Sequence, residues 1–203
     1  MLYCEEANEA RLVGFVVTHP AYSHELHGES FYKVLIASDR LSENKDEIVA
    51  TVSERLICDI DLEIGTKVEI RGQFRSYNNY SGEGSKLILT LFAKDIKLTD
   101  EDCDNEIFLN GYICKPAVFR TTPFGREIAD VLLAVNRAYG KSDYIPCIAW
   151  GRNAKFAELL PVGSNIKVWG RMQSRKYQKK IDEETVVEKI AYEVSVSKLE
   201  LVD

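Results

Sequence analysis

The stretch DYIPCIAWGRNAKFAELL, residues 143–160, reads as a strand that runs into a short helix. Successive side chains of a strand point to opposite faces, so its small apolar residues separate from its large aromatic ones. One face carries Ile145, Cys147 and Ala149, and the other carries Tyr144, Pro146, Ile148 and Trp150. The first set suits a barrel interior, which leaves the aromatic set facing outward. In the helix that follows, Asn153 is placed to cap the start and Pro161 to end it.

The rest of the second half extends this pattern. Strands are predicted at 107–114, 128–137 and 143–151, a helix at 153–160, a long strand at 165–177 and a last strand at 188–201. Residues 178–185, QKKIDEET, read as the polar loop of a hairpin between the last two strands. This order is that of an OB-fold, a five-stranded barrel whose strand face and loops bind oligonucleotides or oligosaccharides.

The first half repeats the second. LVGFVVTHP (12–20) aligns with LNGYICKPA (109–117), and VLIASDR (34–40) with VLLAVNR (131–137), both at an offset of 97. GTKVEIRGQFRS (65–76) aligns with GSNIKVWGRMQS (163–174) at an offset of 98. A nearly constant offset indicates a duplicated domain. The predicted fold class is therefore all-β with short helices, as two tandem five-stranded OB-fold barrels. Residues 1–98 form a divergent acidic OB-fold, 99–106 an acidic linker and 107–203 a second OB-fold.

The long strand at 165–177 interleaves aromatic and cationic residues on one face. Its apolar row is Ile166, Val168, Gly170 and Met172, and the opposite row is Lys167, Trp169, Arg171, Gln173, Arg175 and Tyr177. Bases of a single strand stack on aromatic rings for ~1–3 kcal/mol each, while Lys and Arg contact phosphates. Each such residue alone is more typical of packing or of a solvated surface. Their coincidence on two strands favours nucleic-acid binding.

Charge is distributed unequally between the halves. The net charge is −6, yet residues 1–104 carry 11 Lys and Arg against 20 Asp and Glu, whereas residues 105–203 carry 15 against 12. No apolar run approaches the ~18 residues of a membrane span, and the N-terminus does not resemble a signal peptide. A cytoplasmic protein without membrane contact is expected.

Metal, disulfide and catalytic patterns are weak. The five cysteines (Cys4, Cys58, Cys103, Cys114 and Cys147) are odd in number and form no CxxC pair, so reduced thiols are expected. The three histidines (His19, His24 and His27) lie in a segment interrupted by Pro20 and Gly28, and no metal site is predicted there. Gly82 and Gly84 read as a hairpin rather than a phosphate-binding loop. No nucleophile–base pattern occurs, so neither a catalytic residue nor a cofactor nor an enzyme is predicted.

Five segments of the second half carry a resemblance in order: NGYICKPAVFRTTPFG (110–125), VLLAVNR (131–137), DYIPCIAWGRNA (143–154), VGSNIKVWGRMQSRKY (162–177) and YEVSVSKLELV (192–202). Together they resemble the bacterial single-stranded DNA-binding protein (SSB) family. The resemblance implies stacking positions at Tyr144, Trp150 and Tyr177 and a cation at Arg175, whereas Trp169 and Arg171 rest on alternation alone. The full predicted nucleic-acid-binding set is Tyr144, Trp150, Trp169, Arg171, Arg175, Tyr177, Arg137, Arg152 and Lys176, with a weaker set of Arg71, Arg75 and Tyr77 in the first domain.

The first half departs from the family pattern. The counterparts of Tyr144, Ile148 and Trp150 are Glu47, Thr51 and Ser53, so the aromatic positions are lost. Because the family usually acts as four OB-folds, two per chain imply a homodimer. The acidic tail with which general replicative members recruit partners is not expected after SKLELVD.

The predicted function is non-catalytic, largely sequence-independent binding of single-stranded DNA in replication, recombination and repair, with proteins of those processes as possible partners. The alternative is a primosomal or conjugative accessory protein that works through protein contacts, which the acidic first half favours. An RNA-binding OB-fold protein is a third reading, because no residue pattern reads the 2′-hydroxyl.

Overall fold

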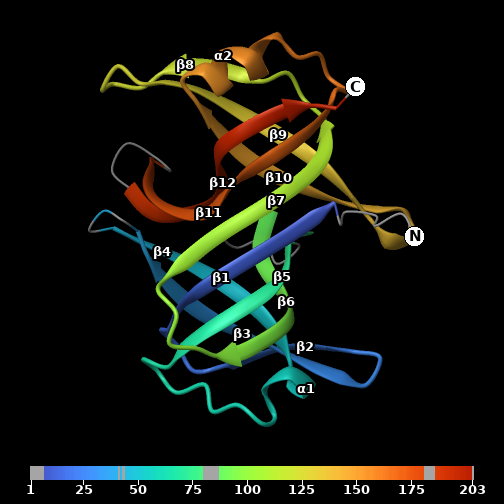
Figure 1. Ribbon diagram of the computed structural model, residues 1–203, viewed down its shortest axis with the longest axis vertical. Helices are drawn as coiled ribbons and strands as arrows, with labels where there is room; N and C mark the ends of the chain where they lie inside the picture. Colours follow the sequence, from blue (N-terminus) through green and yellow to red (C-terminus); the bar gives the residue numbers. More distant parts are fainter. Residues whose placement is uncertain (1–6, 41, 43, 80–86, 181–185, 203) are drawn as a thin grey trace.

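The structure is a computed structural model that describes residues 7–40, 42, 44–79, 87–180 and 186–202 (Figure 1). Cys4, the predicted hairpin at Gly82 and Gly84, and residues 181–185 of the predicted loop at 178–185 lie outside these residues. Within them, no helix is long and apolar enough to cross a membrane.

Each half of the chain forms its own set of mostly antiparallel strands, with one parallel pair, and one short α-helix. The first set is β1 (Asn8–Val16), β2 (Ala21–Leu26), β3 (Glu29–Asp39), β4 (Lys45–Ser53), α1 (Glu54–Ile57), β5 (Lys67–Asn78) and β6 (Leu87–Leu98). The second is β7 (Asp104–Ile113), β8 (Val118–Thr121), β9 (Glu127–Arg137), β10 (Lys141–Trp150), α2 (Arg152–Leu159), β11 (Asn165–Lys180) and β12 (Val186–Leu201), with a 3₁₀ turn at Ala138–Gly140. Pairing of β3 with β1 and of β9 with β7 closes each set, which confirms the predicted tandem OB-fold class.

Two local predictions were wrong. Strand β8, which pairs with β9, was not predicted because its four residues are too few to show alternation. Asn153 does not cap α2. The N-cap is Gly151 at φ 52°, in the left-handed region that favours glycine, and the Asn153 side chain donates a hydrogen bond to the Ser197 carbonyl at 3.1 Å.

The two sets join through an antiparallel pair, β1 with β7, which cross the middle of the molecule side by side (Figure 1). Ala10 pairs with Ile107, its own counterpart at the offset of 97. An approximate two-fold axis therefore passes through this pair and relates the two halves. The result is one continuous strand order across the described chain, β2-β3-β4-β6-β5-β1-β7-β11-β12-β10-β9-β8.

Side chains repeat this symmetry at the junction. Asp143 Oδ1 accepts from the Ser76 amide at 2.8 Å, and Ser76 Oγ accepts from the Tyr144 amide at 2.7 Å. In the related position, Asp46 Oδ1 accepts from the Ser174 amide at 3.3 Å, and Ser174 Oγ accepts from the Glu47 amide at 2.9 Å. These two hydrogen bonds are equivalent to the first two. Each half thus holds the other with the same polar groups.

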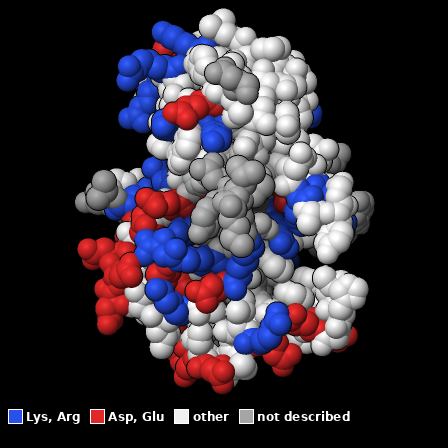
Figure 2. All heavy atoms as spheres, turned by 45° about the vertical axis from the view of Figure 1, so that its right-hand side comes forward, with Lys and Arg blue, Asp and Glu red and all other residues white. Residues whose placement is uncertain are grey.

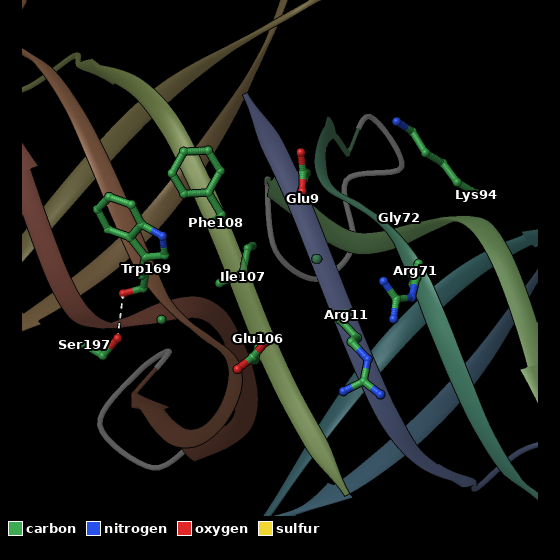
Figure 3. Close-up of a pocket in the computed structure, with 12 residues that line it drawn as sticks. Glu9, Arg11, Arg71, Gly72, Lys94, Glu106, Ile107, Phe108, Trp169 and Ser197 are labelled. Carbon is green, nitrogen blue, oxygen red and sulfur yellow. Dashed lines mark hydrogen bonds between the residues drawn. The ribbon is translucent and has the colours of Figure 1, made fainter. Parts of the chain in front are cut away.

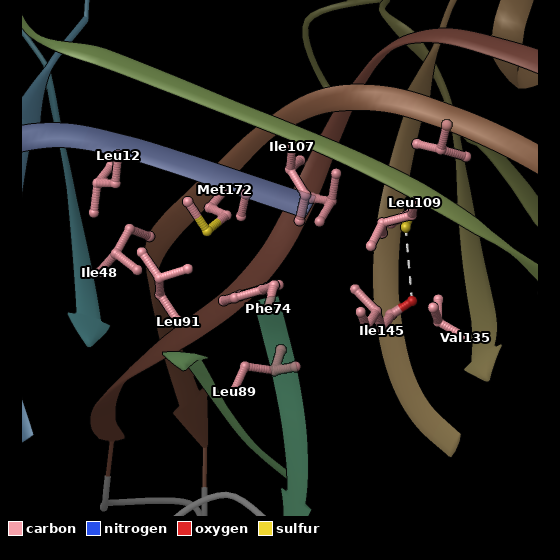
Figure 4. Close-up of a cluster of buried hydrophobic side chains, with 14 of the residues drawn as sticks. Leu12, Ile48, Phe74, Leu89, Leu91, Ile107, Leu109, Val135, Ile145 and Met172 are labelled. Atoms are coloured by element: carbon pink, nitrogen blue, oxygen red, sulfur yellow. Dashed lines mark hydrogen bonds between the residues drawn. The ribbon is translucent and has the colours of Figure 1, made fainter. Parts of the chain in front are cut away.

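One hydrophobic core runs through both barrels. Figure 4 shows Leu12, Ile48 and Leu91 toward one barrel and Ile145 and Val135 toward the other, and the cluster also contains Phe74 and Met172 from the two long strands. Since apolar contacts cross the junction, the two barrels are packed together rather than tethered by a flexible connection.

Candidate nucleic-acid interface

The outer face of the second barrel presents the aromatic row of β10. The inward row at Ile145, Cys147 and Ala149 is buried, whereas Tyr144 is 49% exposed. Ile148 is buried although it shares the outward face. Alternation therefore assigned the inward row correctly but overestimated how much of the outward row reaches solvent.

Trp150, the last residue of β10, is partly buried and fixed by one hydrogen bond. Its indole Nε1 donates to Ser195 Oγ on the neighbouring strand β12 at 3.1 Å. This bond satisfies the only polar atom of the ring and sets its orientation. A ring held in this way keeps one fixed orientation.

Arg175 and Tyr177 form a cation and ring pair on β11. The Arg175 guanidinium carbon lies 5.8 Å from the centre of the Tyr177 ring. Its Nε is 3.3 Å from Glu193 Oε1, and Gln173 Nε2 donates to the same carboxylate oxygen at 2.6 Å. The nearly buried Glu193 holds both side chains, and sequence analysis missed it because alternation along one strand does not identify partners across strands. The exposed Lys176 lies 3.6 Å from Glu188.

Tyr177 borders a groove between the two domains. The groove encloses about 360 Å³. Because residues of both domains line it, the aromatic face of the second barrel opens onto the first barrel. Its second-domain lining is Pro146, Tyr177, Ile190, Ala191, Tyr192 and Glu193, and its first-domain lining includes Lys33, Val49, Leu87, Ile88 and Leu89.

The predicted row on β11 is continuous in sequence but divided in space. A β-bulge between Trp169 and Gly170 shifts the pairing with β12. Trp169 lies against Phe108 with ring centres 5.2 Å apart, and the Lys198 ammonium is 4.5 Å from its ring centre. Figure 3 shows Trp169 and Phe108 with Arg11, Arg71 and Glu106 around a cavity of about 520 Å³ at the β1–β7 junction. Tyr177 does not line this cavity and instead borders the groove between the two domains.

Arg171 bridges the two domains. Its Nε lies 3.4 Å from Asp46 Oδ2, the same carboxylate that Arg40 contacts. Burial and the nearby Arg40 charge lower the pKa of Arg171. We interpret Arg171 first as part of the domain junction.

The other predicted cations occupy separate places. Arg137 lies 3.5 Å from Asp143, and its guanidinium carbon is 5.9 Å from the Tyr77 ring centre, so both belong to the junction. Arg152 is exposed at the start of α2. Arg71 is bound to Glu69 at 2.5 Å.

The first domain holds an aromatic residue that the repeat comparison missed. Phe92 of β6 pairs with Thr51, as Ser195 of β12 pairs with Ile148, so Phe92 is the counterpart of Ser195. Arg75 lies over the Phe92 ring at 3.8 Å. The aromatic side chain is therefore on β6 in the first domain and on β10, as Trp150, in the second. An offset of 103 would have identified it, since the last hairpin of the second domain is longer than that of the first.

The two halves also differ in surface charge. In Figure 2, acidic side chains gather at the lower end, over the first domain, while Lys and Arg group across the middle and at the upper left. A chain of overall negative charge can therefore still carry local groups of positive charge.

Comparisons with known proteins agree on one family. The model of the single-strand binding protein family matches residues 104–202. Single-stranded DNA-binding protein A of Bacillus subtilis is 37% identical over 81 residues, which cover 36% of this chain and 47% of that protein. Single-stranded DNA-binding protein 1 of Staphylococcus aureus is also 37% identical over 81 residues, with 36% and 48% covered. The chain thus spans about half the length of these curated relatives.

Two solved structures extend the comparison. The wild-type single-stranded DNA binding protein from Thermus aquaticus has a TM-score of 0.75 at 20% identity and covers 97% of this chain and 93% of that one, which shows a shared fold over nearly the whole length. The N-terminal domain of PriB protein from Thermoanaerobacter tencongensis is 48% identical over 47% of this chain and all of that domain, with a TM-score of 0.43.

Proposed function

Because residues 104–202 match the single-strand binding protein family, we propose that this chain is a member of that family and that it binds single-stranded DNA without catalysis and largely without regard to sequence. The observation that carries the proposal is the outer face of the second barrel. There Trp150 is fixed by Ser195, and Arg175 lies over Tyr177 beside the groove. Rings for bases next to cations for phosphates are the requirements of sequence-tolerant single-strand binding.

The proposed role is protection of single strands during replication, recombination and repair. We expect two chains to associate, which would bring four OB-folds together, as the family resemblance implies. The protein-contact alternative is supported by the exposed acids around α1, among them Glu54, Asp59 and Glu63. None of these acids lines the groove, so a partner protein bound to them would leave the groove lining free for a single strand.

The test is a fluorescence titration of the full chain with oligo-dT at low and high salt. Trp150→Ala and Tyr177→Ala are each expected to weaken binding by ~1–3 kcal/mol, because each removes a stacking ring. Tyr112→Ala, which removes an exposed ring of β7 outside the predicted set, is the matched control and should bind like the unaltered protein. Affinity should fall steeply as salt rises, since phosphate contacts release counterions. Unchanged affinity in both variants would contradict the assignment.

A further inference from the structure

A small pocket lies on the outer face of the first barrel. It encloses about 260 Å³ and is lined by Ser23, His24, Lys33, Thr51, Tyr77, Ile88 and Thr90. Thr51 and Thr90 are buried and form its floor, Tyr77 is 39% exposed, and Lys33 is exposed at its edge. The volume is below the ~300–1,000 Å³ typical of sites for drug-sized ligands, so it suits a single ring system.

The floor presents a hydrogen-bond acceptor. Thr90 donates its only hydroxyl proton to the Val49 carbonyl at 2.9 Å. Thr51 and Thr90 are also 2.9 Å apart, so the proton between them must come from Thr51. Thr51 Oγ1 is left with free lone pairs toward the pocket, and the Lys33 ammonium supplies donors. A ligand with both a donor and an acceptor on its edge is matched, as every nucleobase has.

The charges of this pocket differ from those of the equivalent place in the second barrel. Strand pairing aligns Lys33 with Asp130 and Thr51 with Ile148. On the last strand, Thr90 aligns with Glu193. Two carboxylates of the second barrel are thus replaced by a cation and a hydroxyl in the first. Among the described residues Lys33 has no ion-pair partner, whereas Asp130 is held by Arg120 at 2.8 Å. The acidic domain therefore has a locally positive site.

This pocket continues the groove at Tyr177. Lys33 and Ile88 line both cavities, so the two spaces adjoin. Arg75, opposite Thr90 on the adjacent strand β5, adds a second cation near the same path. A strand stacked on the second barrel meets this pocket as it passes onto the first.

We propose that the first-domain pocket accepts one nucleobase, with Tyr77 as its wall, Thr51 as acceptor and Lys33 as donor. The first domain is then a base-binding half of one continuous path, in spite of its negative charge. This inference rests on the proposed function, because it concerns the same single strand.

The test compares two lengths of labelled oligo-dT, about 8 and about 30 nucleotides, since one OB-fold covers ~4–16 nucleotides. Tyr77→Ala is expected to weaken binding of the long strand about fivefold or more, the fold-change for loss of one stacked base, and to change the short strand less than twofold. Lys33→Gln should likewise weaken binding of the long strand and leave binding of the short strand unaltered. Lys45→Gln makes the same charge change in the same domain, outside the pocket, and should leave both affinities unaltered.

A second measurement does not depend on variants. Irradiating the unaltered protein with an oligo-dT strand that contains 5-iododeoxyuridine should give a cross-link to Tyr77 or His24, identified by mass spectrometry of peptides. Two results together would overturn the base-binding role of the pocket and leave the proposed function standing. The cross-links would be confined to residues 104–203, and Tyr77→Ala and Lys33→Gln would bind the long strand as Lys45→Gln does. No binding of either strand by the unaltered protein would instead overturn the proposed function.

Discussion

Glu69 on β5 is a buried carboxylate surrounded by three cations. Arg11 Nε lies 3.1 Å, Arg71 Nε 2.5 Å and Lys97 Nζ 3.0 Å from its oxygens. The hydrogen bond from Arg11 and those from Lys97 and Arg71 lower the pKa of Glu69 from 4.5 to about 2, against the effect of burial. A carboxyl whose pKa is lower in the folded state stabilises the fold above its unfolded pKa, and this contribution is lost as pH falls toward the folded pKa.

We therefore expect Glu69→Gln to lower the free energy of unfolding at pH 7 by up to about 3 kcal/mol, the equivalent of the pKa difference. The variant should also lose less stability than the unaltered protein between about pH 5 and pH 2. Urea unfolding at several pH values measures both effects. Glu188→Gln, which removes an exposed carboxylate 3.6 Å from Lys176, is the control and should change stability little. Parallel acid-side slopes for Glu69→Gln and the unaltered protein would contradict the expectation.

Two asparagines at the starts of β1 and β7 extend strand pairing with their side chains. Asn8 donates to the Phe74 carbonyl at 2.8 Å and accepts from the Phe74 amide at 2.9 Å. Asn105 does the same with Met172, at 2.7 and 2.9 Å. Phe74 and Met172 are both in the shared core, so each asparagine secures a long strand where the two barrels meet.

Replacing either asparagine leaves a backbone amide and carbonyl without their partners. Asn8→Ala and Asn105→Ala are each expected to cost ~1–3 kcal/mol of unfolding free energy, and Asn8→Ala at least as much as Asn105→Ala because Asn8 is more buried. Chemical unfolding followed by circular dichroism measures the loss. Asn136→Ala, at an exposed residue that contacts Ser142, should be close to neutral. Equal stability of all three variants would show that the hydrogen bonds of Asn8 and Asn105 contribute nothing to the free energy of unfolding.

Periodicity within single strands was sufficient to predict the longer elements, though not the short strand β8, and it did not predict the contacts between elements. The repeat and the alternation at 143–151 gave two barrels and the buried row at Ile145. They could not give the bulge at Trp169, because a bulge is a property of a strand pair. Glu193 and Phe92 were missed for the same reason. Each acts on a side chain of a neighbouring strand, and the offset that aligns the early strands does not align the last ones. The predicted domain boundaries at 98 and 107 remain a proposal, with β7 starting at Asp104.

The cavity at the two-fold junction is lined by counterparts that differ in chemistry. Arg11 corresponds to Phe108 and Arg71 to Trp169, and all four border the same cavity of about 520 Å³. A second copy turned by two-fold rotation would place its arginines over the aromatic rings of the first, and the reverse contact would form at the same time. This arrangement makes the face self-complementary, which supports the expected homodimer.

Light scattering of the full chain should accordingly give about twice the chain mass of 23.0 kDa. Phe108→Lys is expected to shift the mass toward that of one chain, because it puts a cation where the partner's arginines would pack. Tyr112→Lys, on the same strand but outside the cavity, should leave the mass unaltered. A mass that Phe108→Lys does not change would place the contact on another face.

The pairing of Ala10 with Ile107 relates two halves that share one chain. In a symmetric homodimer every substitution occurs twice, so both binding faces must remain identical. A fused pair is free of that constraint, which is how Lys33 can stand opposite Asp130 in the alignment of the halves. A nucleic-acid strand has a 5′ and a 3′ end, and a platform with identical halves cannot tell them apart. Unequal halves give the protein a polarity, so we expect that a single strand bound across both barrels, as proposed above, would lie in one preferred direction.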